Sequence, residues 1–445
     1  MNQSEKFISE INRVWDTPVP EPVMIRAQKS LLDYLAVTCA GTAFQRNKLE
    51  AYRNFAQPEE GAFKAIGTGW NVSLKEAVFL NGLNSHALDY DDGTNSGIIH
   101  LGAPVFSVLI PLAQRYGIGM GRLLRAAIAG YEASFTIAVS IQPGHKAMGY
   151  HATGTCGTLG AALAAAYMLG FSEEERFQAF AAASVAASGM LKVLDDGSEL
   201  KPYNVAKTAL LSLTALQLAK AGFRGHTDPL GGRGFLKMMT GLEDVKLKPA
   251  LLNGTYAIMK SYTKPYASCR YTHPSVEAAV HLREKIRAED VESIDIRTYE
   301  LAVAGHEHTE IAGSYSAKMS IPYATAVGFL FGQAGMQEFS EETVHDPDVL
   351  SLTRKVHVRP DRELSELFPQ KQTAVVTVHA KNGESLTKRV DYPKGEPENP
   401  LTEEEFRSRY DGLMSYAGVN PAVSDRVFRK VMSDHPDVSA LIEDL

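Results

Sequence analysis

The feature that most constrains the fold is a change in the spacing of apolar residues near Thr263. Upstream of it, apolar residues recur at helical spacing in several segments: residues 23–40, 74–88, 123–140, 157–169, 173–191 and 206–222. Ser172 and Glu175 stand in capping-box relation at the start of one of these segments. Many of the intervening residues are Ala and Gly, which favour close helix packing. The pattern predicts a large all-helical domain.

Downstream of Thr263 the pattern alternates in the manner of half-buried strands. One helix is expected over 275–288, and strands are expected in VESIDIRTY, KVHVRP and QTAVVTVHA. Lys381–Asn382–Gly383 predicts a hairpin turn that leads into ESLTKRVDYP. We therefore expect a smaller α+β domain over residues 263–396.

After a Pro- and Glu-rich connection, helical spacing returns over 402–416 and 422–434. We expect these helices to rejoin the first domain, which then comprises residues 1–262 and 397–445. The α+β domain would interrupt the helical one as a lid, and the two connections between them suit hinged closure. The predicted fold class is mainly α.

The composition of the chain narrows the range of functions and partners to be expected. A hydrophobic fraction of 44%, a charged fraction of 22% and a net charge of −7 are those of a soluble globular protein, and they argue against a nucleic-acid partner. No secretory signal opens the chain, and no stretch reaches the roughly 18 apolar residues of a membrane span. Three scattered cysteines suggest a reducing compartment, so we expect a cytoplasmic protein.

The segment from His86 to His100 gathers three carboxylates, Asp89, Asp91 and Asp92, between two imidazoles. Crowded like charges push pKa values apart, which suits acid–base chemistry. The alternatives are an exposed, turn-rich helix end or a divalent-metal site with oxygen ligands. The segment lacks the Gly-and-Glu frame of a calcium loop, so we expect no metal there.

Two further polar positions lie at expected helix starts. His151, in GYHATGTCGT, precedes a helix whose N-terminal amides could hold an anion, although a lone histidine is equally a satisfied structural residue. Lys201, in GSELKPYNVAK, would add its charge to a helix N-terminus. Lys207, one turn later, is interpreted as solvated.

The expected domain junction carries KPYASCRYTH, which contains Lys264, Cys269, Arg270 and His273. These residues suggest a rim that binds carboxylates, and the alternative is a basic loop at the start of a helix. A nucleophilic Cys269 would need a nearby base such as His273.

Two weaker signals do not change this interpretation. The glycines of residues 117–121 (GIGMG) resemble a dinucleotide loop, but no βαβ unit surrounds them. His306 and His308 are too few to hold a metal. We therefore expect neither an organic cofactor nor a metal.

Together, HALDYDD followed by His100, GYHATGTCGT, KPYN and KPYASCRYTHPSVEA resemble the MmgE/PrpD family in order and spacing across nearly the whole chain. Its members include 2-methylcitrate dehydratases, cis-aconitate decarboxylases and iminodisuccinate epimerases. The resemblance implies a large helical domain interrupted by an α+β lid domain, usually in homodimers, and a small polycarboxylate as the substrate.

The resemblance also implies roles for particular residues. Those matching the family's motifs are Asp89, His100, His151, Lys201, Lys264 and the lid tyrosine Tyr323, with Thr94 in place of a substrate-binding threonine. Two positions depart from the family. Cis-aconitate decarboxylases carry a catalytic histidine where Cys269 aligns, and Asn204 stands where many members have histidine.

The predicted chemistry is removal of a proton alpha to a carboxylate. In this scheme His100 and His151 exchange protons and Asp89 orients one of them, while Lys201, Lys264 and Arg270 neutralise carboxylates. A lyase of the dehydratase or decarboxylase type is the first expectation. An epimerase of a succinate-like amino dicarboxylate is the alternative, and a non-catalytic carboxylate-binding protein is the alternative of another class.

Overall fold

The computed structural model describes residues 1–194, 198–433 and 437–445, and it divides into two compact units. Unit 1 comprises Met1–Lys192, Leu200–Ser261 and Arg407–Leu445, and unit 2 comprises Val193–Glu199 and Tyr262–Phe406. Unit 2 therefore reaches ten residues beyond 396 and takes in a short segment before Leu200.

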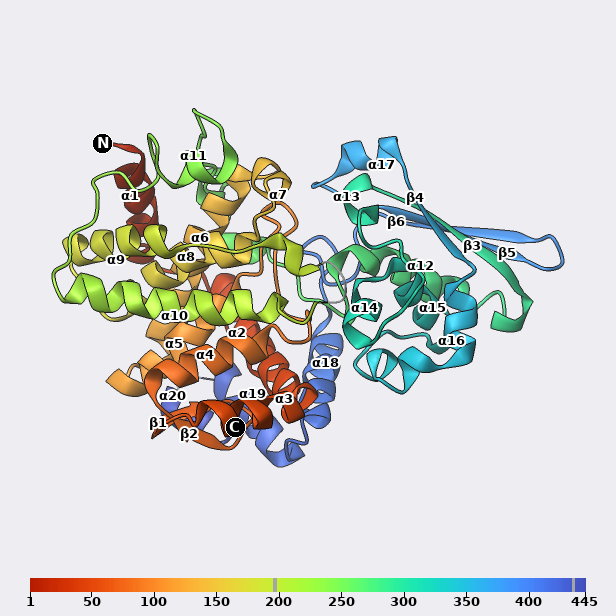
Figure 1. The fold of residues 1–445 in the computed structure, drawn as a ribbon, viewed down its shortest axis with the longest axis horizontal. Helices are drawn as coiled ribbons and strands as arrows, with labels where there is room; N and C mark the ends of the chain where they lie inside the picture. Colours follow the sequence, from red (N-terminus) through yellow and green to blue (C-terminus); the bar gives the residue numbers. More distant parts are fainter. Residues whose placement is uncertain (195–197, 434–436) are drawn as a thin grey trace. The chain divides into compact units, whose positions relative to one another are not determined.

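Unit 1 is built almost wholly of helices, which confirms the predicted mainly α class (Figure 1). Its helices are α1 (Gln3–Asp16), α2 (Glu21–Phe44), α3 (Arg46–Ala56), α4 (Leu74–Ser85), α5 (Gly102–Tyr116), α6 (Met120–Ile141), α7 (Gly144–Ala147), α8 (Ala152–Met168), α9 (Glu173–Ala186), α10 (Lys201–Lys220), α11 (Phe235–Thr240), α18 (Glu403–Tyr416, shared with unit 2), α19 (Pro421–Met432) and α20 (Val438–Ile442). A hairpin of β1 (Glu60–Ala65) and β2 (Trp70–Val72) lies between α3 and α4.

Helix α8 is buried along its whole length and packs against α5, α6, α9 and α10. Small residues allow this close packing, as the sequence predicts. A Cβ atom on Gly160 would lie 2.8 Å from the carbonyl oxygen of Gly130 in α6. The backbone of α8 is therefore held in place, and its N-cap residue His151 with it.

Several helices differ in their ends from the periodic segments of the sequence, and two of these differences affect the polar residues. Helix α10 begins at Lys201, where the sequence predicts a helix start and five residues before the periodic segment, because Pro202 is tolerated in the first turn of a helix. Helix α9 ends at Ala186, not at residue 191. The freed segment bonds to the loop before α8, where the backbone N–H of His151 donates to the carbonyl oxygen of Gly189 (3.0 Å).

Unit 2 contains a four-stranded sheet in the order β4-β3-β5-β6. Its strands are β3 (Val291–Thr298), β4 (Val356–Pro360), β5 (Ala374–Ala380) and β6 (Ser385–Val390). The β3–β4 pair is parallel and the other two pairs are antiparallel, and Gly383 supplies the positive φ of the predicted β5–β6 turn.

The helices of unit 2 are α12 (His273–Leu282), α13 (Glu300–Val303), α14 (Ser314–Met319), α15 (Ile321–Phe331), α16 (Pro347–Thr353) and α17 (Arg362–Leu367). Helices α12 and α15 pack together and against the sheet around an apolar core (Figure 1). Helix α12 ends at Leu282, six residues before the predicted end, and Ile286 beyond it is buried in the same core. Among the described helices of both units, none has the length and apolar character needed to span a bilayer.

Candidate active site

The polar segment that follows α4 forms a buried loop in unit 1. His86 caps the C-terminus of α4, and Asp89, Asp91 and Asp92 are each less than 5% exposed. Asp89 has a φ of 50°, in the left-handed region that non-glycine residues seldom adopt. Such strain costs about 1–3 kcal/mol and persists only where the surroundings enforce it, which is typical of functional sites.

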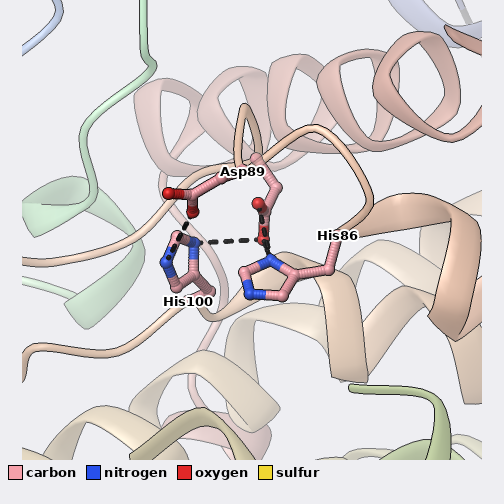
Figure 2. A group of neighbouring side chains, drawn as sticks. His86, Asp89 and His100 are labelled. Atoms are coloured by element: carbon pink, nitrogen blue, oxygen red, sulfur yellow. Dashed lines mark hydrogen bonds and ion pairs between the residues drawn. The ribbon is translucent and has the colours of Figure 1, made fainter. Parts of the chain in front are cut away.

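Asp91 joins the two imidazoles of this loop. Nδ1 of His86 lies 2.8 Å from Oδ1 and 2.9 Å from Oδ2 of Asp91, and Nδ1 of His100 lies 3.1 Å from Oδ2. The rings of His86 and His100 meet edge to face with centroids 4.5 Å apart. Figure 2 shows His86, Asp89 and His100 pointing toward one another. One carboxylate thus orients two imidazoles.

Asp89 lies between a second imidazole nitrogen and an ammonium group. Its Oδ1 atom is 2.7 Å from Nζ of Lys201 and 3.5 Å from Nε2 of His100. Lys201 is the first residue of α10, and its side chain is only 12% exposed. The ammonium of Lys201 is therefore buried in unit 1 and paired with a carboxylate.

His151 completes the group from the N-terminus of α8. Its ring centroid lies 6.1 Å from that of His86, and within the described residues its Nδ1 atom is buried without a hydrogen-bond partner. Thr153, in the first turn of the same helix, accepts a hydrogen bond from the backbone N–H of His100 (3.1 Å). No side chain caps α8, so its N-terminal amides are available to an anion.

The pKa values of two carboxyl groups in this loop, those of Asp91 and Asp92, are shifted in opposite directions. Burial would raise the pKa of Asp91, but the imidazoles of His100 and His86 outweigh burial and hold the pKa below its usual range. Asp92 follows directly, and burial raises its pKa even though Tyr131 donates a hydrogen bond to it. Adjacent carboxyl groups thus differ in acidity, and the main causes are burial and the neighbouring imidazoles, not the crowding of like charges.

Two of the imidazoles are held neutral. Burial lowers the pKa of His86 to about 4, against the opposing effect of Asp91. Burial, followed by the charge of Lys201, lowers the pKa of His151 well below 6.5. His151 is therefore a neutral imidazole, and its Nδ1 atom is buried without a hydrogen-bond partner among the described residues.

The residues predicted from the expected junction lie in unit 2. Lys264 is fully buried, and Arg270 forms a buried ion pair with Glu396. Nη1 of Arg270 also contacts Nδ1 of His273 (2.7 Å). The charge of Arg270 is therefore already balanced within unit 2.

Cys269 contacts an imidazole that the sequence analysis did not suggest as its base. Nε2 of His306 lies 3.6 Å from Sγ of Cys269, and Nε2 of His273, the base suggested from the sequence, faces the carbonyl oxygen of Ser268 (3.2 Å). His306 and His308 do not share a site either, because Nε2 of His308 faces Ser316.

Tyr323 and Thr94 are both buried and engaged locally. The hydroxyl of Tyr323 donates to the carbonyl oxygen of Glu338 (2.8 Å) inside unit 2, and burial raises its pKa. Thr94 pairs with Ile99 across the loop that carries His100 back toward Asp91, and its hydroxyl accepts from the backbone N–H of Gly97 (3.3 Å). Thr94 therefore shapes the loop of the site.

Two residues that the sequence did not single out as catalytic, His86 and Asp91, occupy the centre of the site. Both stand in the segment recognised as rich in acid–base groups. The spacing of His86 and Asp91 carried a signal, because a helix C-terminus followed by a tight loop can fold position 91 back onto position 86. The strained backbone that makes this contact could not be seen from the sequence.

The same atoms have the geometry of a metal site. One ligand atom from each of His86, Asp89, Asp91 and His100 lies within 4.8 Å of the others. However, Oδ1 of Asp89 already binds the ammonium of Lys201, and both oxygens of Asp91 contact imidazoles. The ammonium of Lys201 would repel a divalent cation at this position, so these residues fit a hydrogen-bonded network better than a divalent metal.

Known proteins resemble this chain over most of its length. A cis-aconitate decarboxylase of Aspergillus terreus is 25% identical over 423 residues, covering 89% of this chain and 86% of its own. The cis-aconitate decarboxylase of Mus musculus is 22% identical over 427 residues, covering 92% and 86%. An alkylcitrate dehydratase of Talaromyces stipitatus is 24% identical over 261 residues, covering 55% and 54%.

Models of two protein domains match as well. The MmgE/PrpD N-terminal domain matches residues 10–248, which contain His86, His100, His151 and Lys201, and the MmgE/PrpD C-terminal domain matches residues 266–432. Since the first match alone spans more than half of the 445 residues, the chain belongs to the MmgE/PrpD family.

Proposed function

We propose that this protein is a lyase that removes a proton alpha to a carboxylate of a small di- or tricarboxylic acid. The observation that carries the proposal is the buried group in which Asp91 contacts two imidazoles beside the Lys201–Asp89 pair and the Nδ1 atom of His151, which is buried and has no hydrogen-bond partner among the described residues. The named relatives, a decarboxylase and a dehydratase, are both lyases of such acids, which supports the reaction class.

In the proposed reaction the imidazole of His151 takes the proton from the alpha carbon and becomes an imidazolium. The electron pair of the C–H bond moves toward the carboxylate, which becomes an enolate-like dianion. Lys201 and the N-terminal amides of α8 stabilise that charge, and each well-placed donor contributes about 3–4 kcal/mol.

The reaction then divides according to the substrate. If a hydroxyl group stands on the beta carbon, the electron pair expels it, His100 donates the proton that makes it water, and an unsaturated acid is formed. If no leaving group is present, His100 returns a proton to the opposite face and the product is the epimer. Two imidazoles that approach the alpha carbon from different elements would suit both outcomes, so epimerisation of an amino dicarboxylate remains the second candidate.

The experiment that tests the function is incubation of candidate acids in deuterated water. A lyase yields an unsaturated product, whereas an epimerase incorporates deuterium with inversion of configuration. A protein that only binds carboxylates exchanges no C–H proton, and that result across a panel of di- and tricarboxylates would refute the proposal.

The same assay tests the two imidazoles. His100→Asn and His151→Asn should each lower turnover by about 10²–10⁴-fold, the usual contribution of a general acid or base. His145→Gln is the matched control for the loss of a buried histidine, since His145 is bonded to Thr155 (2.9 Å). Wild-type turnover in both site variants would remove the acid–base assignment.

A further inference from the structure

A residue close to the end of the chain contacts the catalytic loop. Arg409, in α18, forms a buried ion pair with Asp33 of α2. Its Nη2 atom donates to the carbonyl oxygen of Tyr90 (2.8 Å), and its guanidinium carbon lies 4.3 Å from the centre of the Tyr90 ring. One side chain thus binds both the backbone and the ring of the residue between Asp89 and Asp91.

We propose that Arg409 is a positioning residue that holds Asp89 and Asp91 in the arrangement that catalysis requires. The inference rests on the proposed function, because it assigns Arg409 to the machinery of that same site. Neither the sequence pattern nor the relatives' names point to this residue.

The first argument is the place of the hydrogen bond. The carbonyl of Tyr90 belongs to the peptide plane that ends at the nitrogen of Asp91. A donor fixed on that oxygen therefore sets the orientation of the plane, and with it the direction in which the Asp91 side chain leaves the backbone. Since Asp91 orients both His86 and His100, a rotation of this plane would displace both rings.

The second argument is the backbone strain at Asp89, the residue before Tyr90. Asp89, on the other side of Tyr90, has the left-handed φ of 50°. A strained residue relaxes unless its neighbours are fixed. On the far side of the loop, Asp92 is held by the backbone N–H of Gly102 (2.8 Å) and the hydroxyl of Tyr131 (2.6 Å). Arg409 provides an anchor at Tyr90, and the backbone N–H of Asp89 donates to the carbonyl oxygen of His86 (3.2 Å), so Asp89 is held on both sides.

The third argument is the choice of residue. Arginine presents several donors in a rigid plane, so one guanidinium can bind Asp33, donate to a carbonyl and stack on a ring at the same time. A lysine has one compact ammonium and cannot stack in this way. Arg409→Lys therefore keeps the positive charge opposite Asp33 but loses the simultaneous contacts with the carbonyl oxygen and the ring of Tyr90. This substitution separates the effect of the charge from that of the contacts with Tyr90.

The test compares Arg409→Lys with Arg407→Lys in the full chain. Arg407 lies two residues earlier in α18, is 35% exposed, and pairs with Asp411 (2.7 Å) and Asp425 (3.2 Å), away from the loop. We expect kcat of Arg409→Lys to fall by about 10- to 100-fold, the effect of a displacement of about 1 Å in a catalytic group, with KM changed less. Arg407→Lys should keep the wild-type kcat.

A second readout does not need a substrate. The side-chain ¹⁵N resonances of His86 and His100 report on their contacts with Asp91, and we expect both to shift in Arg409→Lys and to stay in place in Arg407→Lys. If no polycarboxylate is turned over, the proposed function fails, and these resonances still decide the positioning role. If turnover is found and both variants match the wild type in kcat and resonances, the role of Arg409 is refuted while the function stands.

Should Arg409→Lys fail to fold, Asp33→Asn replaces it. The asparagine still accepts a hydrogen bond but no longer holds the guanidinium by charge, so kcat and the two resonances should move in the same direction by a smaller amount. Unchanged values of both in a folded Asp33→Asn protein would overturn the proposal.

Discussion

The Nζ atom of Lys201 lies 2.7 Å from Oδ1 of Asp89, although 112 residues separate the two in the chain. The ammonium that should receive a substrate carboxylate is thus already paired with a carboxylate of the protein. A substrate anion would have to share or replace this contact, and Asp89 would then turn its charge toward His100, 3.5 Å away. In the proposed reaction the pair would couple substrate binding to the charge beside His100.

The coupling predicts the effect of removing the ammonium. Lys201→Met should lower kcat/KM by about 10²–10³-fold, because the loss of one preorganised donor has this effect where charge develops. Lys207→Met is the matched control, since Lys207 lies in the same helix and donates to Ser188 (2.9 Å). The kcat/KM of both variants is measured by steady-state kinetics, with the substrate that the incubations in deuterated water identify. Equal values for the two variants would contradict the role of Lys201.

Much of the helical unit could be predicted from the sequence because its signals are local. Ser172 and Glu175 form the capping box that their spacing predicts, and apolar periodicity placed α2, α6 and α8 within a few residues of their ends. Helix α15 gave no such signal, because its residues are apolar on every side and show no periodicity.

Only part of the site could be predicted, because only part of it is encoded in local sequence motifs. His100, His151, Asp89 and Lys201 were found through family motifs, and the structure brings them together in unit 1. The roles of Asp91 and Arg409 depend on a strained loop and on a helix more than 300 residues away, and no local pattern encodes such contacts. For Lys264, Arg270 and Tyr323 a role in catalysis stays a prediction.

Exhaustive chelation should leave turnover unchanged. The four possible ligand atoms around Asp91 lie close enough for a divalent cation, but the ammonium of Lys201 occupies Oδ1 of Asp89 and would repel it. Activity after dialysis against EDTA, with and without added Mg²⁺, Mn²⁺ or Zn²⁺, measures this. Activity lost on chelation and restored by one of these ions would show that the network holds a metal during turnover.

The pKa of His151 should rise when Lys201 is replaced. Burial is the main cause that lowers this pKa, and the positive charge of Lys201 is the next. Removing a nearby cation favours the protonated imidazole, so the pKa of His151 should move up in Lys201→Met and still remain below 6.5, because burial persists. Titration of the imidazole ¹⁵N resonances checks this, with Lys207→Met as control. A pKa that is unchanged or lower in Lys201→Met would argue against the proximity of the two groups.

His145 gives a prediction for stability that is independent of catalysis. Burial lowers its pKa from 6.5 to about 4, so between these values the unfolded chain binds a proton that the folded chain does not. The stability that His145 contributes is therefore complete above pH 6.5 and is lost as the pH falls toward 4, by on the order of 3 kcal/mol across the window. In His145→Gln this component is absent, so its urea midpoint should fall less steeply with acid than that of the wild type. The slopes are compared, since the substitution also changes packing at every pH. Parallel slopes in the two proteins would mean that His145 is protonated in the folded state as readily as in the unfolded one.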